Sequence, residues 1–144
     1  MRITREEVFQ LLKMSKAQPL DAKLVVETND RGIAIGEAKF GTPDSSDEST
    51  TDVKLLPEFW GNGYGREIKQ GLVDWLFTNT TCQRIKATPN KRNRSSQKMQ
   101  EAVGARLEGE TTYKFPEKMK DYTVDLDLFV YVVHKEDWVK SRAT

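Results

Sequence analysis

Near the middle of the chain, apolar residues recur every three or four positions. They are Ile68, Leu72, Trp75, Leu76 and Phe77. This spacing places side chains on one face of an α-helix, so we expect a helix of about fourteen residues beginning near Arg66. Trp75 and Phe77 should belong to the core.

Two further stretches have helical spacing. Residues 5–14 contain a short amphipathic pattern, and Thr4 with Glu7 before and within it forms a capping box. Asn93 to Val103 forms the other helix, which Gly104 should end as a C-terminal cap. The face of this helix predicted to be buried consists of Met99, Ala102 and Val103.

Shorter runs of β-branched and apolar residues predict strands. They are Lys23–Thr28, Ile33–Phe40, Val53–Leu56, Arg84–Thr88, Ala105–Tyr113 and Tyr122–Val133. The first two flank the turn Asn-Asp-Arg-Gly at residues 29–32, which predicts an antiparallel hairpin. In the last run, apolar residues alternate from Val124 to Val132, which predicts a long, half-buried antiparallel strand.

The stretch GTPDSSDESTT, residues 41–51, is polar, acidic and interrupted by proline, so we expect a mobile surface loop there. The complete order is helix, hairpin, strand, helix, strand, helix and two closing strands. Such an order predicts a mixed α/β sheet. A chain of 144 residues fits a single domain, here residues 1–144.

Composition narrows the function. Lys and Arg number 23 against 22 Asp and Glu, so the net charge of +1 gives no general attraction to nucleic acids or acidic membranes. One cysteine, Cys82, and one histidine, His134, exclude an ordinary Cys/His zinc cluster, and we expect no metal. The chain has no apolar run of roughly 18 residues and no signal-peptide core, so we expect a cytoplasmic protein without a membrane partner.

The stretch Trp60 to Gly65, WGNGYG, joins a predicted strand to a predicted helix. The first backbone N–H groups of a helix lack intrahelical partners and carry partial positive charge, and glycines let a ligand approach them. The amides of Gly61 to Arg66 are therefore expected to bind a pyrophosphate. A tight turn without a ligand is the alternative. The spacing fits neither a nucleotide P-loop nor a dinucleotide fingerprint, which leaves coenzyme A.

The run LLPEFWGNGYGREIKQGLVDWLF, followed by RIKATPNKRNRSSQKMQEAVGARLEGE, resembles the acetyl-CoA-binding core of the GNAT superfamily of N-acetyltransferases. It is most similar to the branch of ribosomal-protein N-terminal alanine acetyltransferases, which typically reads LPEYWGKGYA, then N-x-x-S, then a Leu-Gly-Phe helix end. Asn93 and Ser96 keep the N-x-x-S spacing, and Gly104 stands eight residues after Ser96. The resemblance covers about Val53 to Gly109. It is weak before Asp52, and Ala105 replaces the usual Phe.

The resemblance implies a single GNAT-like domain with a split, mostly antiparallel sheet flanked by helices, and acetyl-CoA as co-substrate. It places Leu55 and Leu56 beside the pantetheine arm, where the sheet opens, although core packing is the alternative for both. It also places Asn93 near that arm, although Asn93 is equally suited to cap the following helix. The residues expected to bind the co-substrate are Leu55, Leu56, Trp60, Gly61, Asn62, Gly63, Tyr64, Gly65, Arg66, Asn93 and Ser96.

Aromatic and basic residues near these motifs have two interpretations each. Trp60 and Tyr64 would stack on adenine or fill the core, and we favour the core for Trp60. The loop with Lys91, Arg92 and Arg94 would reach the 3′-phosphate of coenzyme A or simply be solvated.

Acetyl transfer also needs acid and base groups. By resemblance Ser96 lies near the thioester sulfur, where its hydroxyl would protonate the leaving thiolate. Glu37 and Asp52 are the candidate bases, with an ordinary exposed carboxylate as the alternative for each. Cys82 has no nearby His and is not expected to act as a nucleophile.

The predicted function is acetyl transfer from acetyl-CoA to a primary amine, either a protein N-terminus or a small molecule. The alternative is a non-catalytic acyl-CoA-binding module of the same fold. Binding of nucleic acid through KRNRSSQK is disfavoured, because a single basic loop on a nearly neutral chain lacks stacking aromatics. We expect a monomer or a homodimer.

Overall fold

The computed structural model describes residues 23–27, 31–119 and 121–142, and the helix predicted over residues 5–14 lies outside them. Within this part the chain forms one six-stranded sheet with the order β1-β2-β3-β4-β6-β5. Its strands are β1 Lys23–Glu27, β2 Ala34–Phe40, β3 Glu48–Leu55, β4 Arg84–Ala87, β5 Arg106–Tyr113 and β6 Leu126–His134. Only the β3–β4 pair is parallel. The mixed sheet and the antiparallel β1–β2 hairpin confirm the predicted fold class.

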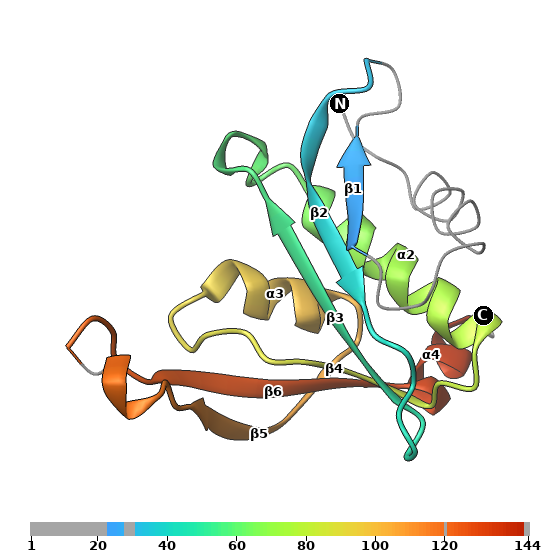
Figure 1. Cartoon of the computed structure of the whole chain (residues 1–144). Coiled ribbons are helices and arrows are strands. Elements are labelled where there is room, and N and C mark those ends of the chain that lie inside the picture. The colour runs from blue at the N-terminus through green and yellow to red at the C-terminus, as the bar shows by residue number, and fades with distance from the viewer. Residues whose placement is uncertain (1–22, 28–30, 120, 143–144) are drawn as a thin grey trace.

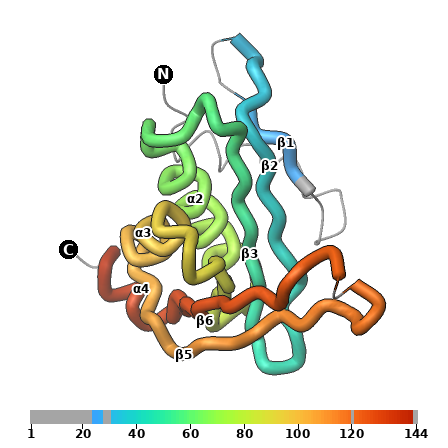
Figure 2. The backbone as a smooth tube through the Cα atoms, turned by 90° about the vertical axis from the view of Figure 1, so that its left-hand side faces the viewer, coloured from blue at the N-terminus to red at the C-terminus, as the bar shows by residue number. Residues whose placement is uncertain are grey.

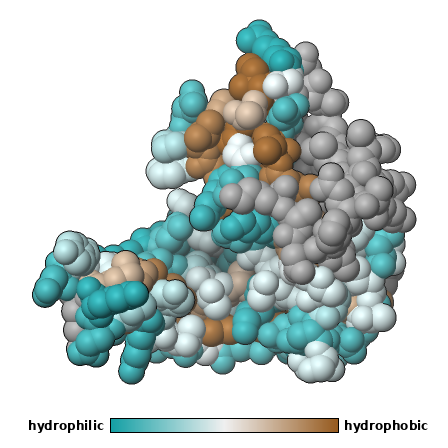
Figure 3. All heavy atoms as spheres, viewed as in Figure 1, coloured by the Kyte–Doolittle hydropathy of each residue, from teal (hydrophilic) through white to brown (hydrophobic). Residues whose placement is uncertain are grey.

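The sheet opens between its two central strands. β3 and β4 pair only at Glu48–Arg84, Ser49–Ile85 and Thr50–Lys86. Beyond these pairs they diverge, so that β1–β3 and β4–β6 form two arms joined at one end (Figure 1). We call the point after the Thr50–Lys86 pair the apex of the split. The indentation of the surface between the two arms is visible in Figure 3.

Three α-helices in the described residues accompany the sheet: α2 Tyr64–Asn79, α3 Arg94–Ala102 and α4 Lys135–Arg142. Figure 2 shows α2 and α3 on the same side of β3. The apolar face of α2 supplies much of the core, and Trp75 and Phe77 are buried as predicted. Helix α2 is 16 residues long and begins slightly before the predicted start, at Tyr64. None of the helices in the described residues is long and apolar enough to cross a membrane.

The last helix, α4, was not predicted from the sequence, and a buried carboxylate is one of the groups that hold it in place. Asp74 of α2 accepts hydrogen bonds from Trp138 Nε1 at 2.8 Å and Gln70 Nε2 at 3.0 Å. Arg142 Nη1 lies 3.2 Å from the same oxygen, Oδ1. The Trp138 ring also contacts Phe77, with ring centroids 5.4 Å apart. Side chains far apart in the sequence therefore make α4 part of the fold.

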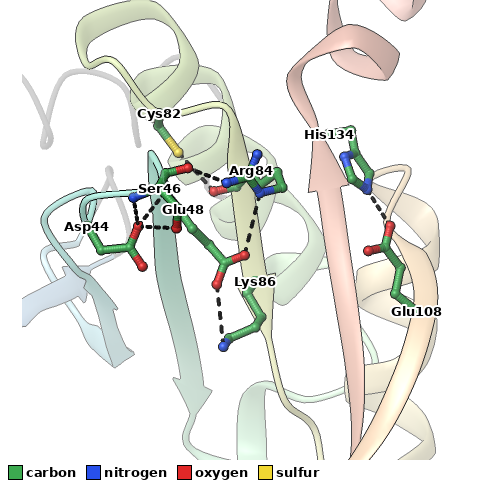
Figure 4. A network of polar contacts seen from close by, with 8 residues as sticks. All are labelled: Asp44, Ser46, Glu48, Cys82, Arg84, Lys86, Glu108 and His134. Carbon is green, nitrogen blue, oxygen red and sulfur yellow. Dashed lines mark hydrogen bonds and ion pairs between the residues drawn. The ribbon is translucent and has the colours of Figure 1, made fainter.

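The prediction of a mobile loop over residues 41–51 was wrong for the last residues of this range. Glu48–Thr51 form the beginning of β3, with Ser49 and Thr51 buried. Glu48 is held by two cations of β4, since its carboxylate lies 3.6 Å from Arg84 Nε and 3.4 Å from Lys86 Nζ (Figure 4). Pairing with both β2 and β4 thus compensates for the polarity of this segment.

The turn before β3 is also fixed. The carboxylate of Asp44 accepts hydrogen bonds from the Ser46 hydroxyl and from the backbone N–H groups of Ser46 and Glu48 (Figure 4). These bonds, the hydroxyl first, lower the pKa of Asp44 below its ordinary value. The Asp47 carbonyl accepts a hydrogen bond from the Gln83 N–H at 2.8 Å. This turn therefore closes the joined end of the two arms.

Two further predictions of boundaries and faces were wrong. The last strand begins only at Leu126, because Tyr122 and Val124 are exposed and unpaired with β5. The buried residues of α3 are Gln97 and Gln100 rather than Met99 and Ala102, whereas Val103, its C-cap, is buried as predicted. Gln97 tolerates burial because its Nε2 donates to the carbonyls of Asn90 at 3.2 Å and Lys91 at 2.9 Å. Apolar periodicity could not reveal a buried amide whose partners lie in the preceding loop.

Candidate functional site

The open edge of β3 faces the split. The Leu56 N–H donates to the Ile35 carbonyl at 2.9 Å, and the Gly41 N–H donates to the Thr50 carbonyl at 2.9 Å. Even-numbered residues of β3 therefore direct their peptide groups toward β2. Because peptide direction alternates along a strand, Val53 and Leu55 direct theirs toward β4, beyond the last β3–β4 pair. Within the described residues, no strand pairs with this edge.

This geometry refines the predicted contacts of the pantetheine arm. Leu55 lies on the open edge, although its carbonyl already accepts a hydrogen bond from Trp60 Nε1 at 2.9 Å. The N–H of Leu56 is directed to β2 instead. Val53, which sequence reasoning missed, has the same peptide direction as Leu55. The sequence alone could have identified Val53 only if the register of the β2–β3 pair were known, because the direction of the peptide groups alternates from that register.

The glycine turn opens the start of α2. Gly61 has φ 78° and Gly63 has φ 80°, in the left-handed region that favours glycine. Gly63 is the N-cap of α2, and no side chain caps the helix. The first backbone bond runs from the Glu67 N–H to the Gly63 carbonyl at 3.1 Å. Among the described residues, nothing accepts a hydrogen bond from the N–H groups of Tyr64, Gly65 and Arg66, so three donors converge at the helix start.

Gly65 lets α2 approach both β3 and α3 closely. A Cβ atom at this position would lie 3.1 Å from Met99 Sδ of α3 and 3.6 Å from Leu55 Cδ1 of β3. The start of α2 is therefore packed against the open end of β3 on one side and against α3 on the other. The open helix terminus and the open strand edge thus belong to one site.

Trp60 is not a core residue, contrary to our preference. Its side chain is 64% exposed, and its ring lies beside the turn because its indole N–H is bound to Leu55. Tyr64 is buried instead, with its ring centroid 6.3 Å from that of Phe59. Asn62 Nδ2 donates to the Trp60 carbonyl at 3.1 Å and so braces the turn. The exposed Trp60 ring can contact an aromatic ligand, whereas Tyr64 supports the turn from within.

Asn93 and Ser96 lie at the start of α3. Asn93 is the N-cap, and its Oδ1 accepts a hydrogen bond from the Ser96 N–H at 3.1 Å. The capping interpretation of Asn93 is therefore realised, which leaves its Nδ2 for other partners. Ser96 is half-buried in the first turn of α3. Lys91 of the preceding loop pairs with Glu110 at 3.1 Å and lies over the Phe129 ring, so this cation is engaged by β5 and β6.

The two candidate bases lie on the face of the sheet opposite α2. Glu37 is paired in register with Lys54, and Asp52 with Lys39. Asp52 lines a hollow of about 210 Å³ together with Lys39, Phe40, Gly41 and Thr50. Its carboxylate is half-exposed, 3.9 Å from Lys54 Nζ. Of the two carboxylates, Asp52 is nearer the apex of the split, because Thr50 makes the last pair with β4.

Sequence reasoning also missed Lys69 of α2. Only 1% of this residue is exposed, and Nζ donates a hydrogen bond to Thr51 Oγ1. Burial lowers the pKa of Lys69 to about 7, although the negative charge of Asp52 acts in the opposite direction. A signal was present in the sequence: Lys69 falls on the same helix face as Ile68, Leu72 and Leu76, which are all buried.

The chain is similar to a known family of domains and to several solved structures. The family model described as an acetyltransferase (GNAT) domain matches residues 2–106. No match was found among curated proteins. Among solved structures, the ribosomal-protein-S5-alanine acetyltransferase of Vibrio fischeri is 25% identical with a TM-score of 0.71, and the alignment covers 92% of this chain and 71% of that one.

Two more distant structures share the fold. The spermidine N-acetyltransferase of Vibrio cholerae, solved with CoA and spermine, is 17% identical with a TM-score of 0.71, covering 93% of this chain and 77% of that one. A GNAT-family acetyltransferase of Bacillus anthracis is 22% identical with a TM-score of 0.67; the alignment covers 79% of this chain and 66% of that one. The chain belongs to the acetyltransferase (GNAT) domain family, as the resemblance predicted.

Proposed function

We propose that this protein transfers an acetyl group from acetyl-CoA directly to a primary amine, which is a protein N-terminus or a small molecule. The observation that carries the proposal is the meeting of two sets of unused backbone groups. The N–H groups of Tyr64, Gly65 and Arg66 suit an anionic pyrophosphate, and the peptide groups of Val53 and Leu55 suit the amides of a pantetheine arm. Gly65 allows the two sets to be adjacent.

Acetyl-CoA supplies an activated thioester when bound. In the transfer, the amine nitrogen forms a bond to the carbonyl carbon, the carbon–sulfur bond breaks, the nitrogen loses a proton and the thiolate gains one. We assign the proton acceptor to Asp52 rather than Glu37, because Asp52 lines the hollow next to Thr50. We assign the proton donor to the hydroxyl of Ser96. Asp52→Asn tests the base: steady-state kinetics should show kcat lower by about 10²-fold with CoA affinity unchanged.

For the acceptor, only the chemical class is assigned, that of amines. The three structures compared are described as acting on the alanine of a ribosomal protein, on spermidine, or simply as an acetyltransferase. The first two acceptors are amines, which supports the amine class for this chain. The hollow beside Asp52 offers one carboxylate and one cation, Lys39, to an incoming acceptor.

A non-catalytic acyl-CoA-binding module is the second candidate. It is favoured by the weak resemblance before Asp52 and by Ala105 in place of the usual Phe. A panel of amines and peptides, assayed for release of free thiol, distinguishes the two. Binding of acetyl-CoA without turnover of any acceptor would support the module.

Gly63→Val is expected to abolish CoA binding measured by isothermal titration calorimetry. Valine is disfavoured at φ 80°, and its side chain would restrict access to the helix N–H groups. Gly104→Val is the matched control, because Gly104 has φ 89° with open space around it and lies at the far end of α3. The control should suffer a similar strain of about 1–2 kcal/mol yet bind CoA normally. Lack of CoA binding by the unaltered protein at millimolar concentration would refute the proposal.

Ser96→Ala is expected to lower kcat by about 10²-fold while leaving CoA affinity unchanged. The variant keeps the backbone N–H that binds Asn93 Oδ1, so the helix cap is preserved. Ser95→Ala is the control, since Ser95 is the exposed neighbour on the same turn. Steady-state kinetics on the best acceptor of the panel decides the role, and an unchanged kcat for Ser96→Ala would exclude the hydroxyl as proton donor.

A further inference from the structure

Lys69 lies directly behind the apex of the split. Its Nζ donates to the hydroxyl of Thr51, the residue that follows the last β3–β4 pair. One turn earlier on α2, Gly65 lies against Leu55 at the open end of the same strand. The first turns of α2 therefore lie along the open edge of β3. The free N–H groups of the helix are near Leu55 at the open end of this edge, and Lys69 is near Thr51 at the apex. A ligand extended along this edge from the helix start would end near Lys69.

Lys69 has no ion-pair partner among the residues that the structure describes. In the part of the chain that the structure describes, no carboxylate lies within ion-pair distance of Lys69 Nζ. The one charge that acts on it there is Asp52, whose side chain lies on the opposite face of β3 and is half-exposed. Ser49, the next residue of β3 on the interior face, is fully buried, and its hydroxyl has no hydrogen-bond partner among the described residues. Among the described residues, the hydrogen-bond partner of the Lys69 ammonium is thus a neutral hydroxyl, that of Thr51.

A buried amine without a countercharge is costly, and a hydrophobic residue of similar size would pack here more favourably. Its location suggests which anion it would serve. In acetyl transfer, negative charge develops at the thioester end of the co-substrate, on the carbonyl oxygen and then on the departing sulfur. Preorganised charge in a water-excluded site is an effective way to stabilise such an anion.

We propose that Lys69 is a positioning residue that, through Thr51, stabilises the thiolate of coenzyme A at the apex of the split. This inference rests on the proposed function. Because Thr51 Oγ1 accepts the hydrogen bond from Lys69, the hydroxyl proton is left to point elsewhere and can be donated. The ammonium and the thiolate stabilise each other across this hydroxyl, and no bond is made or broken by Lys69 itself.

The test uses the full-length protein with CoA and requires no acceptor. The ultraviolet absorbance of the thiolate is titrated against pH for bound CoA, and the signal of the CoA-free protein is subtracted because Cys82 also carries a thiol. We expect the thiolate to form at lower pH in the unaltered protein than in Lys69→Met, by about one pH unit or more. Since the two groups titrate as a coupled pair, the comparison between variants carries the information.

Two further variants make the result specific. Lys69→Arg keeps the positive charge and should restore the lower midpoint. Lys98→Met removes an exposed lysine of α3 and should leave the midpoint unchanged. CoA binding with equal midpoints in the unaltered protein and Lys69→Met would overturn this inference alone. No CoA binding by the unaltered protein would overturn the proposed function, and the inference with it.

Discussion

Lys69→Met is expected to raise the free energy of unfolding by about 3–5 kcal/mol at pH 6. The pKa of Lys69 is about 7 in the folded protein, against the value of 10.5 for a fully solvated lysine, which describes the unfolded chain. Burial therefore disfavours the charged form. Below pH 7 both the folded and the unfolded state carry the proton, and the folded state bears the full penalty. Methionine has a similar length and no charge, so it removes that penalty.

The sign of the pH dependence follows from proton binding. Between the folded pKa of about 7 and the unfolded value of 10.5, the unfolded state binds more protons, so the unaltered protein becomes more stable as pH rises. The advantage of Lys69→Met should accordingly shrink across this window and nearly vanish above it. Urea denaturation at several pH values measures both effects.

A matched control distinguishes the effect of burying the amine from the effect of removing one positive charge. Lys98→Met also removes one positive charge, but Lys98 is exposed on α3. The free energy of unfolding of this variant should therefore differ from that of the unaltered protein by less than about 0.5 kcal/mol. A destabilised Lys69→Met, or an advantage independent of pH, would contradict burial of this amine. A variant that is more stable and yet loses the thiolate shift would show that the lysine serves function at the expense of stability.

Asp74→Ala is expected to lower the free energy of unfolding by about 2–4 kcal/mol. The substitution deprives Trp138 Nε1 and Gln70 Nε2 of their acceptor and leaves Arg142 without its anion. Helix α4 has no buried residues of its own, so it depends on these contacts and on the ion pair between its Asp137 and Arg106 of β5, at 2.6 Å. Its detachment would also uncover Phe77, which packs against the Trp138 ring.

Thermal unfolding and urea titration measure this effect, and Asp74→Asn is the control. Asparagine keeps an oxygen that accepts from the indole N–H but lacks the charge that attracts Arg142, so it should lose less than half as much stability. Equal losses in the two variants would mean that the charge, rather than the hydrogen bonds, holds α4. An unchanged stability of Asp74→Ala would refute the role of this carboxylate altogether.

Local patterns predicted much of the fold. The β1–β2 hairpin, β4 and both central helices were expected because periodicity, turn residues and caps act between neighbours in the chain. Gly104, with φ 89°, ends α3 as its position predicted. The segment Glu48–Thr51 was missed because its polar side chains are stabilised by residues distant in the sequence. The partners of Glu48 in β4 lie more than thirty residues away, and the partner of Thr51 in α2 lies about twenty residues away.

The candidate site was foreseen in part. The glycine turn and the Asn93–Ser96 spacing could be recognised because helix starts have short-range signatures. The role of each residue in ligand binding and catalysis stays a prediction. Trp60 was expected in the core, yet its indole N–H is held outside by the Leu55 carbonyl. An aromatic residue beside glycines does not reveal on which side of the turn it lies.

The sequence by itself determined the β1–β2 hairpin, β4, the two central helices and the glycine turn at the start of α2, since these depend on contacts within a few residues. Only the tertiary structure decided which edge of β3 stays unpaired, that Val53 and Leu55 line it, and that Lys69 is sealed behind Thr51. The physical reason is that strand pairing and burial are set by segments distant in the chain. A lysine among leucines has the same local pattern whether its ammonium reaches water or not.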